Sequence, residues 1–427
     1  MVKDFICRRE MVPGMVFTYG TKNFQETIVI GNKQEVSLDE NGKLVPAVEK
    51  MSEDTIFDLA SVTKLFTSLS ILKLIELGQI NLNTKIINVC PQFKNLTNVT
   101  IYNLLSFNIP LKTNGRVDNA RTKEEAEKIL FDINIDKESS NIRPYTDMGS
   151  MILKYVVERV SGMSYYNFLN QYILMELGLN DTHVVVPKYK LDRLASTNFD
   201  GKLYKDGNFS ITNFPKGNVY DQKARVMGQM EGDLSGHAGL FSSTQDMSTL
   251  AKSIIDGRVI DEKYIKMMAK NRTGKVINKN ENGENDYVQY LGFLCYSKNP
   301  ILTNSKLFHA MSGRSIASAG WTGTQLTIDP INELFFFLGS NSSHNRMSFI
   351  DTAQKSNIMI DGNNKRTIVL SNGELKIDAT RFAWDRDSVV VHPALKLAIQ
   401  YKMLEDILSY TKEKKEGNQN IRKILKV

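Results

Sequence analysis

Cysteine is scarce in this chain, and nothing in the sequence has the spacing of a metal site. The 427 residues include three cysteines, Cys7, Cys90 and Cys295, and five scattered histidines. An odd number of widely separated cysteines predicts no disulfide framework. Cysteine and histidine do not occur together at the spacing of zinc ligands, which argues against a zinc hydrolase. We therefore expect neither a bound metal nor a cofactor.

Long apolar runs are also missing. No apolar stretch is long enough to cross a membrane as a helix, which takes about 20 residues. The first ten residues carry charges on both sides of a short apolar patch, which is unlike a signal peptide. These features predict no membrane span and a cytoplasmic protein, or an exported one whose leader has been removed.

Charge of one sign is only slightly in excess. Lys and Arg number 54 against 47 Asp and Glu, for a formal net charge of +7. The one dense basic run is the tail, residues 412–427, where glutamates are interleaved. A solvated chain end is a better interpretation of this tail than a binding arm. Nothing in this distribution indicates a nucleic acid partner.

The Gly-x-Ser-x-Gly turn of the α/β-hydrolases is absent as well, but another serine motif is present. Ser61-Val-Thr-Lys64 follows a strand-like run and opens a long apolar stretch that ends at Gly78. Residues three apart share a helix face, so the Ser61 hydroxyl and the Lys64 amine can lie within hydrogen-bond reach. A lysine with a lowered pKa can take the serine proton, and the positive end of a helix favours such lowering. This pattern predicts a serine nucleophile with a lysine base.

The tetrapeptide is not specific by itself. Ser-x-x-Lys also occurs at Ser70–Lys73 and Ser409–Lys412. Ser70 lies in the middle of the apolar stretch, where a hydroxyl usually bonds back to a carbonyl of the preceding turn. Only Ser61 stands at a helix start, and there the alternative is that it simply caps the helix.

Two further motifs follow in order along the chain. The first is Pro144-Tyr145-Thr146-Asp147, which opens a helix, and the second is Ser318-Ala-Gly320-Trp321-Thr-Gly, which precedes a strand. Together with Ser61 and Lys64, they resemble the β-lactamase-related serine hydrolases. This family includes class C β-lactamases, penicillin-binding proteins, D-alanyl-D-alanine peptidases and esterases. Segments at 100–105, 176–182 and 236–242 are also similar to family motifs, so the resemblance covers about residues 12–342 and the last helix.

The resemblance implies an α/β (α+β) fold in which an antiparallel sheet is flanked by helices. The hydrolase domain is expected to comprise residues 1–342 and 391–427, with an all-helical subdomain at about 79–200. Residues 343–390 depart from the family pattern and are interpreted as an insertion with a β-hairpin at Asn372-Gly373. We read residues 200–235 as irregular, and Pro393–Tyr410 as an amphipathic terminal helix. Helices are further expected at 61–77, 100–106, 122–132, 147–160, 164–177, 245–255 and 261–270.

The resemblance also assigns roles to individual residues. Ser61 is expected to become acylated, with Lys64 as base or proton relay and Tyr145 passing the proton to the leaving group. The backbone N–H groups of Ser61 and Trp321 are expected to form the oxyanion hole. Gly320 is expected to let the substrate lie close to its strand.

Two positions depart from the pattern of the β-lactamases. Asp147 replaces an asparagine, and an ionised carboxylate near Lys64 raises the lysine pKa and makes it a poorer base. Asp147 is alternatively a helix cap. Ser318 replaces the Lys or His that binds a substrate carboxylate, so β-lactams remain possible ligands only if Arg314 or another cation serves. His237 is interpreted as a structural histidine bonded to a loop carbonyl, and Tyr220-Asp221 as loop architecture.

These observations predict a serine hydrolase that acts on a small ester, amide or peptide through an acyl-enzyme on Ser61. Its partner is a small-molecule or peptide substrate. Two alternatives remain open. One is a penicillin-binding or sensor-like protein with little or no turnover, suggested by Asp147 and Ser318. The other is an interaction protein that uses residues 343–390 on a hydrolase scaffold.

Overall fold

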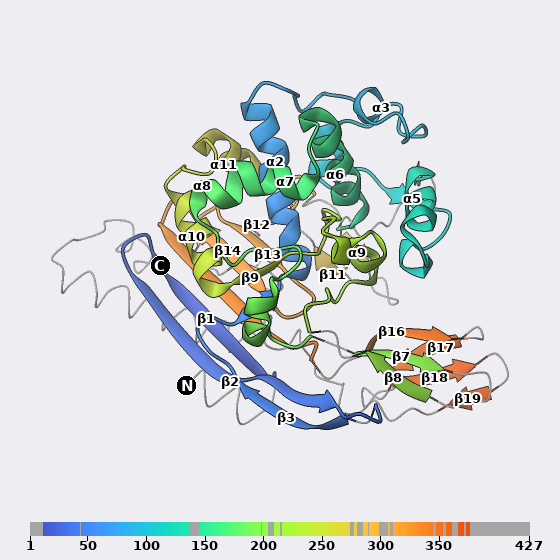
Figure 1. Ribbon diagram of the computed structural model, residues 1–427. Helices are drawn as coiled ribbons and strands as arrows, with labels where there is room; N and C mark the ends of the chain where they lie inside the picture. The colour runs from blue at the N-terminus through green and yellow to red at the C-terminus, as the bar shows by residue number, and fades with distance from the viewer. Residues whose placement is uncertain are drawn as a thin grey trace.

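A seven-stranded antiparallel sheet combines strands from residues 14–50 with strands from residues 296–340 (Figure 1). The computed structural model describes residues 12–42, 44–136, 145–197, 199–203, 209–213, 216–273, 277–279, 285–288, 290–298, 306–307, 311–344, 347–352, 356–360, 366–370 and 373–375. In spatial order the strands are β12 (Tyr296–Ser297), β13 (Ile316–Ala319), β14 (Gln325–Asp329), β15 (Leu334–Ser340), β1 (Gly14–Thr21), β2 (Gln25–Leu38) and β3 (Leu44–Lys50). The first strand therefore pairs with a strand more than 300 residues later, from Met15 opposite Ser340 to Thr21 opposite Leu334.

The sequence of β15 explains its central place in this sheet. Leu-Phe-Phe-Phe-Leu-Gly-Ser is buried at every position, and such a continuous apolar run is typical of a strand covered on both faces. Helix α10 (Thr244–Ile255) packs across β1, β14 and β15. Its Ser243 caps the helix by accepting the N–H of Asp246, which fixes where the chain turns from strand into helix.

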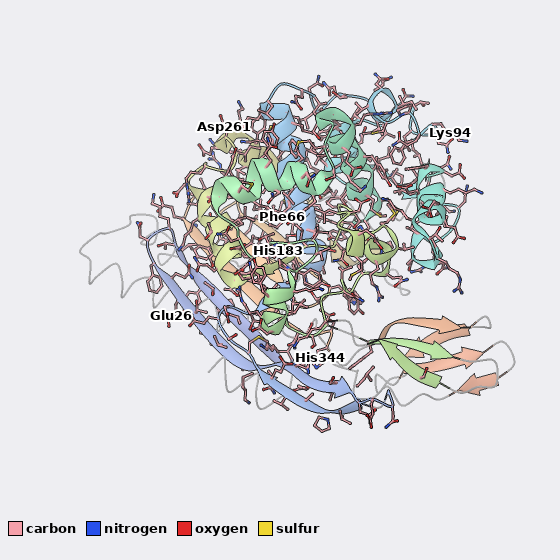
Figure 2. The ribbon with its side chains drawn as sticks, viewed as in Figure 1. Glu26, Phe66, Lys94, His183, Asp261 and His344 are labelled. Carbon is pink, nitrogen blue, oxygen red and sulfur yellow. The ribbon has the colours of Figure 1, made fainter. Side chains whose placement is uncertain are left out.

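Helix α2 (Thr63–Glu76) is the most deeply buried helix of the described chain. Its residues from Thr63 to Leu72 are all buried, polar ones included. A helix that is buried on every side, as α2 is, belongs to the protein interior and does not lie at the surface. Figure 2 shows Phe66 of this helix inside the molecule, whereas Lys94 and Asp261 lie at its periphery. Helices α6 (Met148–Ser161) and α7 (Tyr165–Leu169) pack against α2.

Most of the predicted helices are present with nearly the predicted bounds. Among the described residues between 86 and 193, the regular elements are helices joined by loops, apart from the two-residue strands β5 (Leu111–Lys112) and β6 (Asn134–Ile135). The other helices are α3 (Ile86–Val89), α4 (Ile101–Leu105), η2 (Val117–Asn119), α5 (Lys123–Phe131), η3 (Asn170–Leu174), α8 (Met175–Leu177), η4 (Lys188–Arg193), α9 (Gln222–Val226), η5 (Gln229–Glu231) and α11 (Glu262–Ala269).

The prediction that residues 200–235 are irregular was wrong at its start and near its end, where α9 and η5 lie. β7 (Phe199–Leu203) and β8 (Phe209–Asn213) form an antiparallel pair, and β16 (Met347–Thr352) joins β7 in parallel. The β7–β8 pair is local, and Asp206-Gly207 between the two strands is a hairpin signal that the prediction overlooked. The partner β16 lies far away in sequence, where pairing has no local signature. Further short strands are β4 (Ile56–Asp58), β9 (Phe241–Ser243), β10 (Ile277–Lys279) and β11 (Asn285–Val288).

The segment after residue 343 contains the expected hairpin. β18 (Arg366–Leu370) and β19 (Gly373–Leu375) pair antiparallel with Leu370 opposite Gly373, and β17 (Ser356–Ile360) lies on the other side of β18. Together with β7, β8 and β16 these strands lie at one side of the molecule (Figure 1). The terminal helix predicted at Pro393–Tyr410 and the tail at 412–427 fall outside the described residues.

In the portion of the chain that the structure describes, every helix is too short or too polar to cross a bilayer.

Candidate active site

A strained turn presents Ser61 at the start of α2. Strand β4 leads into this turn, and Ala60 has a φ of 45°, which costs a non-glycine residue about 1–3 kcal/mol. The buried Asp58 carboxylate supports the turn by accepting the Ala60 N–H at 2.8 Å. Ala60, Ser61 and Val62 then form the short helix η1, which runs directly into α2.

The turn between β13 and β14 holds the same strained segment from its other side. The Thr322 hydroxyl donates to the Asp58 carbonyl at 2.7 Å, and the Thr324 hydroxyl donates to the Leu59 carbonyl at 3.0 Å. Ser318 on β13 donates from its hydroxyl to the Ser61 carbonyl at 3.3 Å. Residues 58–62, which we call the nucleophile turn for the role predicted for Ser61, are therefore joined to the β13–β14 region by three hydrogen bonds.

Ser61 and Lys64 meet as the sequence predicts. Lys64 Nζ donates to Ser61 Oγ at 2.8 Å, and the lysine side chain is completely buried. The alternative that Ser61 only caps the helix was wrong, because Val62 is the N-cap residue and no side chain caps α2. Ser70 donates to the Phe66 carbonyl at 2.9 Å, as expected for a hydroxyl inside a helix. The Ser409 motif lies outside the described residues.

Asp147 is an ion-pair partner of Lys64 rather than a helix cap. Its Oδ1 atom lies 2.8 Å from Lys64 Nζ, and its side chain makes no capping bond to α6. Burial alone would lower the pKa of Lys64, but the Asp147 charge and then the Tyr145 hydroxyl together raise it above its ordinary value. The pKa of Asp147 is below its usual range although burial opposes this, because Lys64 and other cations lie beside it.

Lys64 is therefore placed as an ammonium group. Its Nζ atom lies within 3.3 Å of three acceptors, namely Ser61 Oγ, Asp147 Oδ1 and the His237 carbonyl. A charged lysine has three N–H donors, and this arrangement suits them. The helix terminus does not produce the lowered pKa expected from position alone. The other expectation from the sequence, that the Asp147 carboxylate raises the pKa of Lys64, agrees with the structure.

Tyr145 is fixed by the rings around it. Its ring stacks on Phe107 with centroids 5.2 Å apart and on Tyr296 with centroids 5.6 Å apart. Lys64 Nζ lies 4.9 Å from the centroid of the Tyr145 ring, within the range of a cation–π contact. Tyr145 is thus brought to Lys64, as predicted, and its ring is held between two others.

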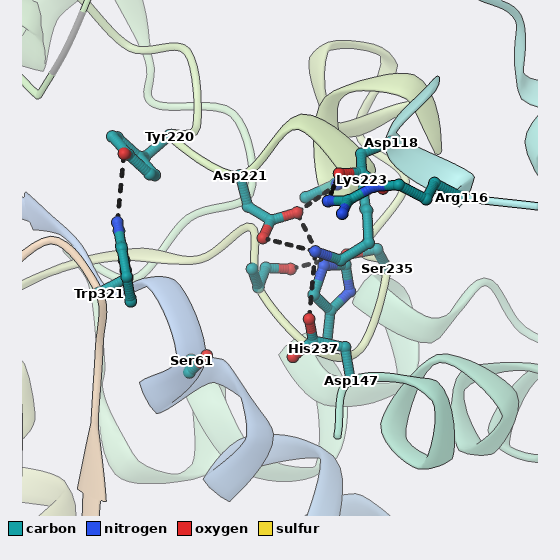
Figure 3. A network of polar contacts seen from close by, with 12 residues as sticks. Ser61, Arg116, Asp118, Asp147, Tyr220, Asp221, Lys223, Ser235, His237 and Trp321 are labelled. Carbon is teal, nitrogen blue, oxygen red and sulfur yellow. Dashed lines mark hydrogen bonds and ion pairs between the residues drawn. The ribbon is translucent and has the colours of Figure 1, made fainter. Parts of the chain in front are cut away.

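A second lysine extends this ion-paired site (Figure 3). Lys223 Nζ lies 3.1 Å from Asp147 Oδ2 and 3.3 Å from Asp221 Oδ2. His237 Nε2 contacts Asp221 Oδ1 at 2.9 Å, and its Nδ1 contacts Ser235 Oγ at 3.1 Å. His237 is therefore bonded to a carboxylate and a hydroxyl, and the expected bond to a loop carbonyl was wrong.

Sequence reasoning missed Lys223 and underrated Asp221. Asp221 does support its loop, since it caps α9 by accepting the Ala224 N–H at 3.0 Å. Burial raises the pKa of a carboxyl group, but His237 and Lys223 hold that of Asp221 well below its usual range. Burial lowers the pKa of Lys223, but Asp221 and Asp147 raise it above its ordinary value. The only signal in the sequence was a lysine two residues after an aspartate already noted in a family-like segment.

Asp147, Asp221 and His237 are also the described residues that come nearest to a metal site. Their potential ligand atoms lie within 4.8 Å of one another. Both carboxylates, however, already face ammonium groups at 2.8 to 3.3 Å. A divalent cation would have to displace Lys223 or Lys64, so the arrangement is that of an ion-pair network.

Trp321 lies on the side of Ser61 away from the ion-pair network (Figure 3). Its side chain is 52% exposed, and its indole N–H donates to the Tyr220 hydroxyl at 3.1 Å (Figure 3). The Tyr220 backbone N–H in turn donates to Asp58 Oδ2 at 2.6 Å. Arg314, considered above as a substitute cation, lies at the other end of β13 and is within 3.7 Å of Glu262.

Gly320 is required by the nucleophile turn itself. A Cβ atom at this position would lie 2.2 Å from Thr324 Oγ1 and 2.4 Å from the Leu59 carbonyl oxygen. The close approach that demands glycine here is thus between the strand and the nucleophile turn. This contact is separate from the substrate approach suggested by the sequence.

Gly320→Ala is therefore expected to lower the free energy of unfolding by about 1–3 kcal/mol, as overpacking does. It should also slow the reaction of Ser61, because the turn that presents Ser61 must shift. Urea unfolding and the rate of labelling by an active-site probe measure the two effects. Gly313→Ala is the control, since a Cβ there meets no atom within 4 Å. Equal behaviour of both variants would contradict the expectation.

Comparison with known proteins agrees with this architecture. The sequence pattern of the family described as "Beta-lactamase" matches residues 14–356. A protein of Escherichia coli K12, named provisionally as a D-alanyl-D-alanine carboxypeptidase, is 26% identical over 328 residues, covering 69% of this chain and 71% of that protein.

Two solved structures share the fold. The octameric penicillin-binding protein homologue from Pyrococcus abyssi has a TM-score of 0.56 and 19% identity, over 80% of this chain and 72% of its own. EstCE1, a hydrolase with promiscuous acyltransferase activity, has a TM-score of 0.57 and 16% identity, over 80% of this chain and 93% of its own.

The fold and the matched residues define the class of protein, one built on the β-lactamase and penicillin-binding-protein fold, as predicted. The chain belongs to the Beta-lactamase family. The proteins similar to this one thus include one named provisionally as a carboxypeptidase and one described as a hydrolase.

Proposed function

We propose that this protein is a serine hydrolase that forms an acyl-enzyme on Ser61 and cleaves a small, uncharged ester or amide. One observation carries the proposal. The hydroxyl of Ser61 accepts a 2.8 Å hydrogen bond from a lysine that is completely buried. A serine needs such a partner to lose its proton, and few structural roles justify burying a lysine beside it.

The proposed reaction begins when Ser61 Oγ attacks the substrate carbonyl carbon. The hydroxyl proton leaves through Lys64 and Tyr145 and is passed to the leaving oxygen or nitrogen as the carbonyl–leaving-group bond breaks. The backbone N–H groups of Ser61 and Trp321 are assigned to the oxyanion that forms in between. Water then attacks the ester carbonyl and gives a proton to the same relay. The Ser61 Oγ–acyl bond breaks, the acid is released, and the relay returns the proton to Ser61 Oγ.

The charges near Ser61 favour an uncharged substrate. Ser318 offers only a hydroxyl, which bonds to the Ser61 carbonyl. Among the residues that the structure describes around Ser61 (Figure 3), each cation already has an acidic partner. The pairs are Lys64 with Asp147, Lys223 with Asp147 and Asp221, and Arg116 with Asp118. A substrate carboxylate would have to compete with these partners, which disfavours penicillins and peptides with a free C-terminus.

A second candidate function is a binding or sensor protein that is acylated slowly. The raised pKa of Lys64 favours it, because a protonated lysine cannot accept the serine proton. The two functions differ in how quickly the acyl group is lost from Ser61, so the rate of deacylation separates them.

The test is intact-protein mass spectrometry after exposure to a fluorophosphonate, a labelled penicillin and an activated butyrate ester. We expect one fluorophosphonate adduct on the native protein and on Ser70→Ala, and none on Ser61→Ala. Ser70 is the matched control, since it belongs to a Ser-x-x-Lys sequence in the same helix. We expect butyrate to turn over, and penicillin to react more slowly or not at all.

Each outcome has a defined meaning. A lasting butyryl adduct without turnover would support the sensor function over the hydrolase. Fast reaction with penicillin would contradict the preference for uncharged substrates. Folded native protein that gains no adduct from any reagent would overturn the proposal.

A further inference from the structure

One short segment, Tyr220–Lys223, touches three separate parts of the candidate site. The Tyr220 N–H binds Asp58 below the nucleophile turn, and the Tyr220 hydroxyl binds the Trp321 indole. Three residues later, Lys223 reaches Asp147. The segment thus connects the turn that presents Ser61, the strand beside it and the loop that carries Tyr145.

Lys223 and Lys64 share one carboxylate. Lys64 Nζ lies 2.8 Å from Asp147 Oδ1, and Lys223 Nζ lies 3.1 Å from Asp147 Oδ2. The side chain of Lys223 is 19% exposed and that of Lys64 is fully buried. Asp147 therefore divides its charge between an inner ammonium that contacts Ser61 and an outer one that does not.

We propose that Lys223 is a positioning residue for acyl transfer, which binds the second oxygen of Asp147 and so limits the hold of that carboxylate on the Lys64 ammonium. The inference rests on the proposed function of Ser61 and Lys64. Lys223 does not touch Ser61, and its effect passes through Asp147. It offsets part of the negative charge that Asp147 imposes on the base.

The other charged and titratable groups around these two lysines are consistent with this role. Lys64 faces Tyr145 besides Asp147. Lys223 faces Asp221 and, farther away, Asp118, which is paired with Arg116. Asp147 also lies near His237, which is bonded to Asp221. Lys223 is the member that contacts both carboxylates of this network, so its removal changes the field at Lys64 through Asp147.

Removing the charge of Lys223 should leave the fold in place. Asp147 would still have Lys64, and Asp221 would still have His237 and the Ala224 N–H. The pKa of Lys64 should then rise further, because the whole Asp147 charge acts on it. The small fraction of neutral Lys64 at neutral pH would fall further, and the serine would react more slowly there.

The experiment measures the rate of fluorophosphonate labelling of Ser61 from pH 6 to 12, so that the range includes the pH at which Lys64 loses its proton. At pH 7, Lys223→Met should label about tenfold more slowly than the native protein, which corresponds to a shift of about one pH unit. Its rate should recover at higher pH. Lys223→Arg keeps the charge and should follow the native profile within about twofold. Lys112→Met, which removes an exposed lysine far along the chain on β5, controls for the loss of one positive charge.

A second readout does not depend on labelling. The ionisation of Lys64 can be followed by NMR in protein carrying carbon-13 lysine, with its signal assigned by its loss in Lys64→Met. We expect Lys64 to titrate at higher pH in Lys223→Met than in the native protein. Lys223→Gln is the second variant, to be used if the methionine variant does not fold.

The outcomes separate this inference from the proposed function. If native protein is never labelled but Lys64 still shifts on loss of Lys223, the proposed function fails and the influence of Lys223 on Lys64 stands. If labelling proceeds and neither the rate profile nor the Lys64 titration moves, the inference about Lys223 is overturned. A uniform loss at all pH values that arginine does not rescue would assign Lys223 a merely structural role.

Discussion

Lys64→Met is expected to slow the reaction of Ser61 with an activated ester by about a thousandfold, the middle of the range for loss of a positioned acid or base. Lys64 donates directly to Ser61 Oγ, and methionine has similar length but no proton to accept or donate. The fold should survive, because Asp147 keeps Lys223 as a partner. Stopped-flow measurement of the acyl-enzyme, beside a thermal melt, tests this result.

The matched control is Lys73→Met on the same helix. Lys73 follows Ser70 with the same spacing, but it pairs with Glu76 at 2.9 Å near the end of α2. This variant should react like the native protein within about twofold. A folded Lys64→Met variant that keeps near-native rates would remove Lys64 from the mechanism.

Asp147→Asn is expected to move the pH profile of acylation toward lower pH. In the native protein, the Asp147 charge raises the pKa of Lys64 against the effect of burial. The neutral lysine, which accepts the serine proton, therefore forms only at high pH. Asparagine removes the charge and leaves burial as the largest influence, so the pKa of Lys64 falls. For each protein, the rate at pH 7 is expressed as a fraction of its own plateau rate at high pH. This fraction should be at least about tenfold larger for the variant than for the native protein, as a shift of one pH unit implies.

Asp233→Asn supplies the control for this second prediction. Asp233 pairs with Lys154, another buried lysine, at 3.0 Å. Lys154 also contacts Glu158, whereas Lys64 contacts a serine. Loss of this pair should lower stability and leave the pH profile unchanged. A profile for Asp147→Asn that stays in place, or moves to higher pH, would show that the carboxylate does not govern Lys64.

The helices and the main motifs could be predicted from sequence because their signals are local. The apolar stretch after Ser61, the N-caps Thr100 and Thr122, and the continuous apolar run of β15 each act over a few residues. Strands β7 and β8 pair locally, and the Asp206-Gly207 signal between them was overlooked. Their partner β16 was missed because it meets β7 almost 150 residues away in sequence. Pairing over such distances has no local signature.

In the candidate site, too, the residues with a local sequence signal could be predicted, and those that depend on distant contacts could not. Ser61, Lys64, Tyr145 and Asp147 carry recognisable spacing, and the structure brings them together. Lys223 could not be predicted, because its importance depends on which carboxylates approach it in space. The part played by Gly320 was likewise misjudged, since only the folded structure shows that the Leu59 carbonyl occupies the space beside it.

The pairing of β1 with β15 has a consequence for synthesis of the protein. A nascent chain of 300 residues already contains Ser61, Lys64, Tyr145, Asp147 and Lys223. It still lacks β13, β14 and β15, whose turn braces the strained Ala60 and whose last strand binds β1. Contacts between residues so distant in sequence form late and slowly. The turn that presents Ser61 therefore lacks these braces until residues 322 and 324 have been synthesised and β13 to β15 have formed.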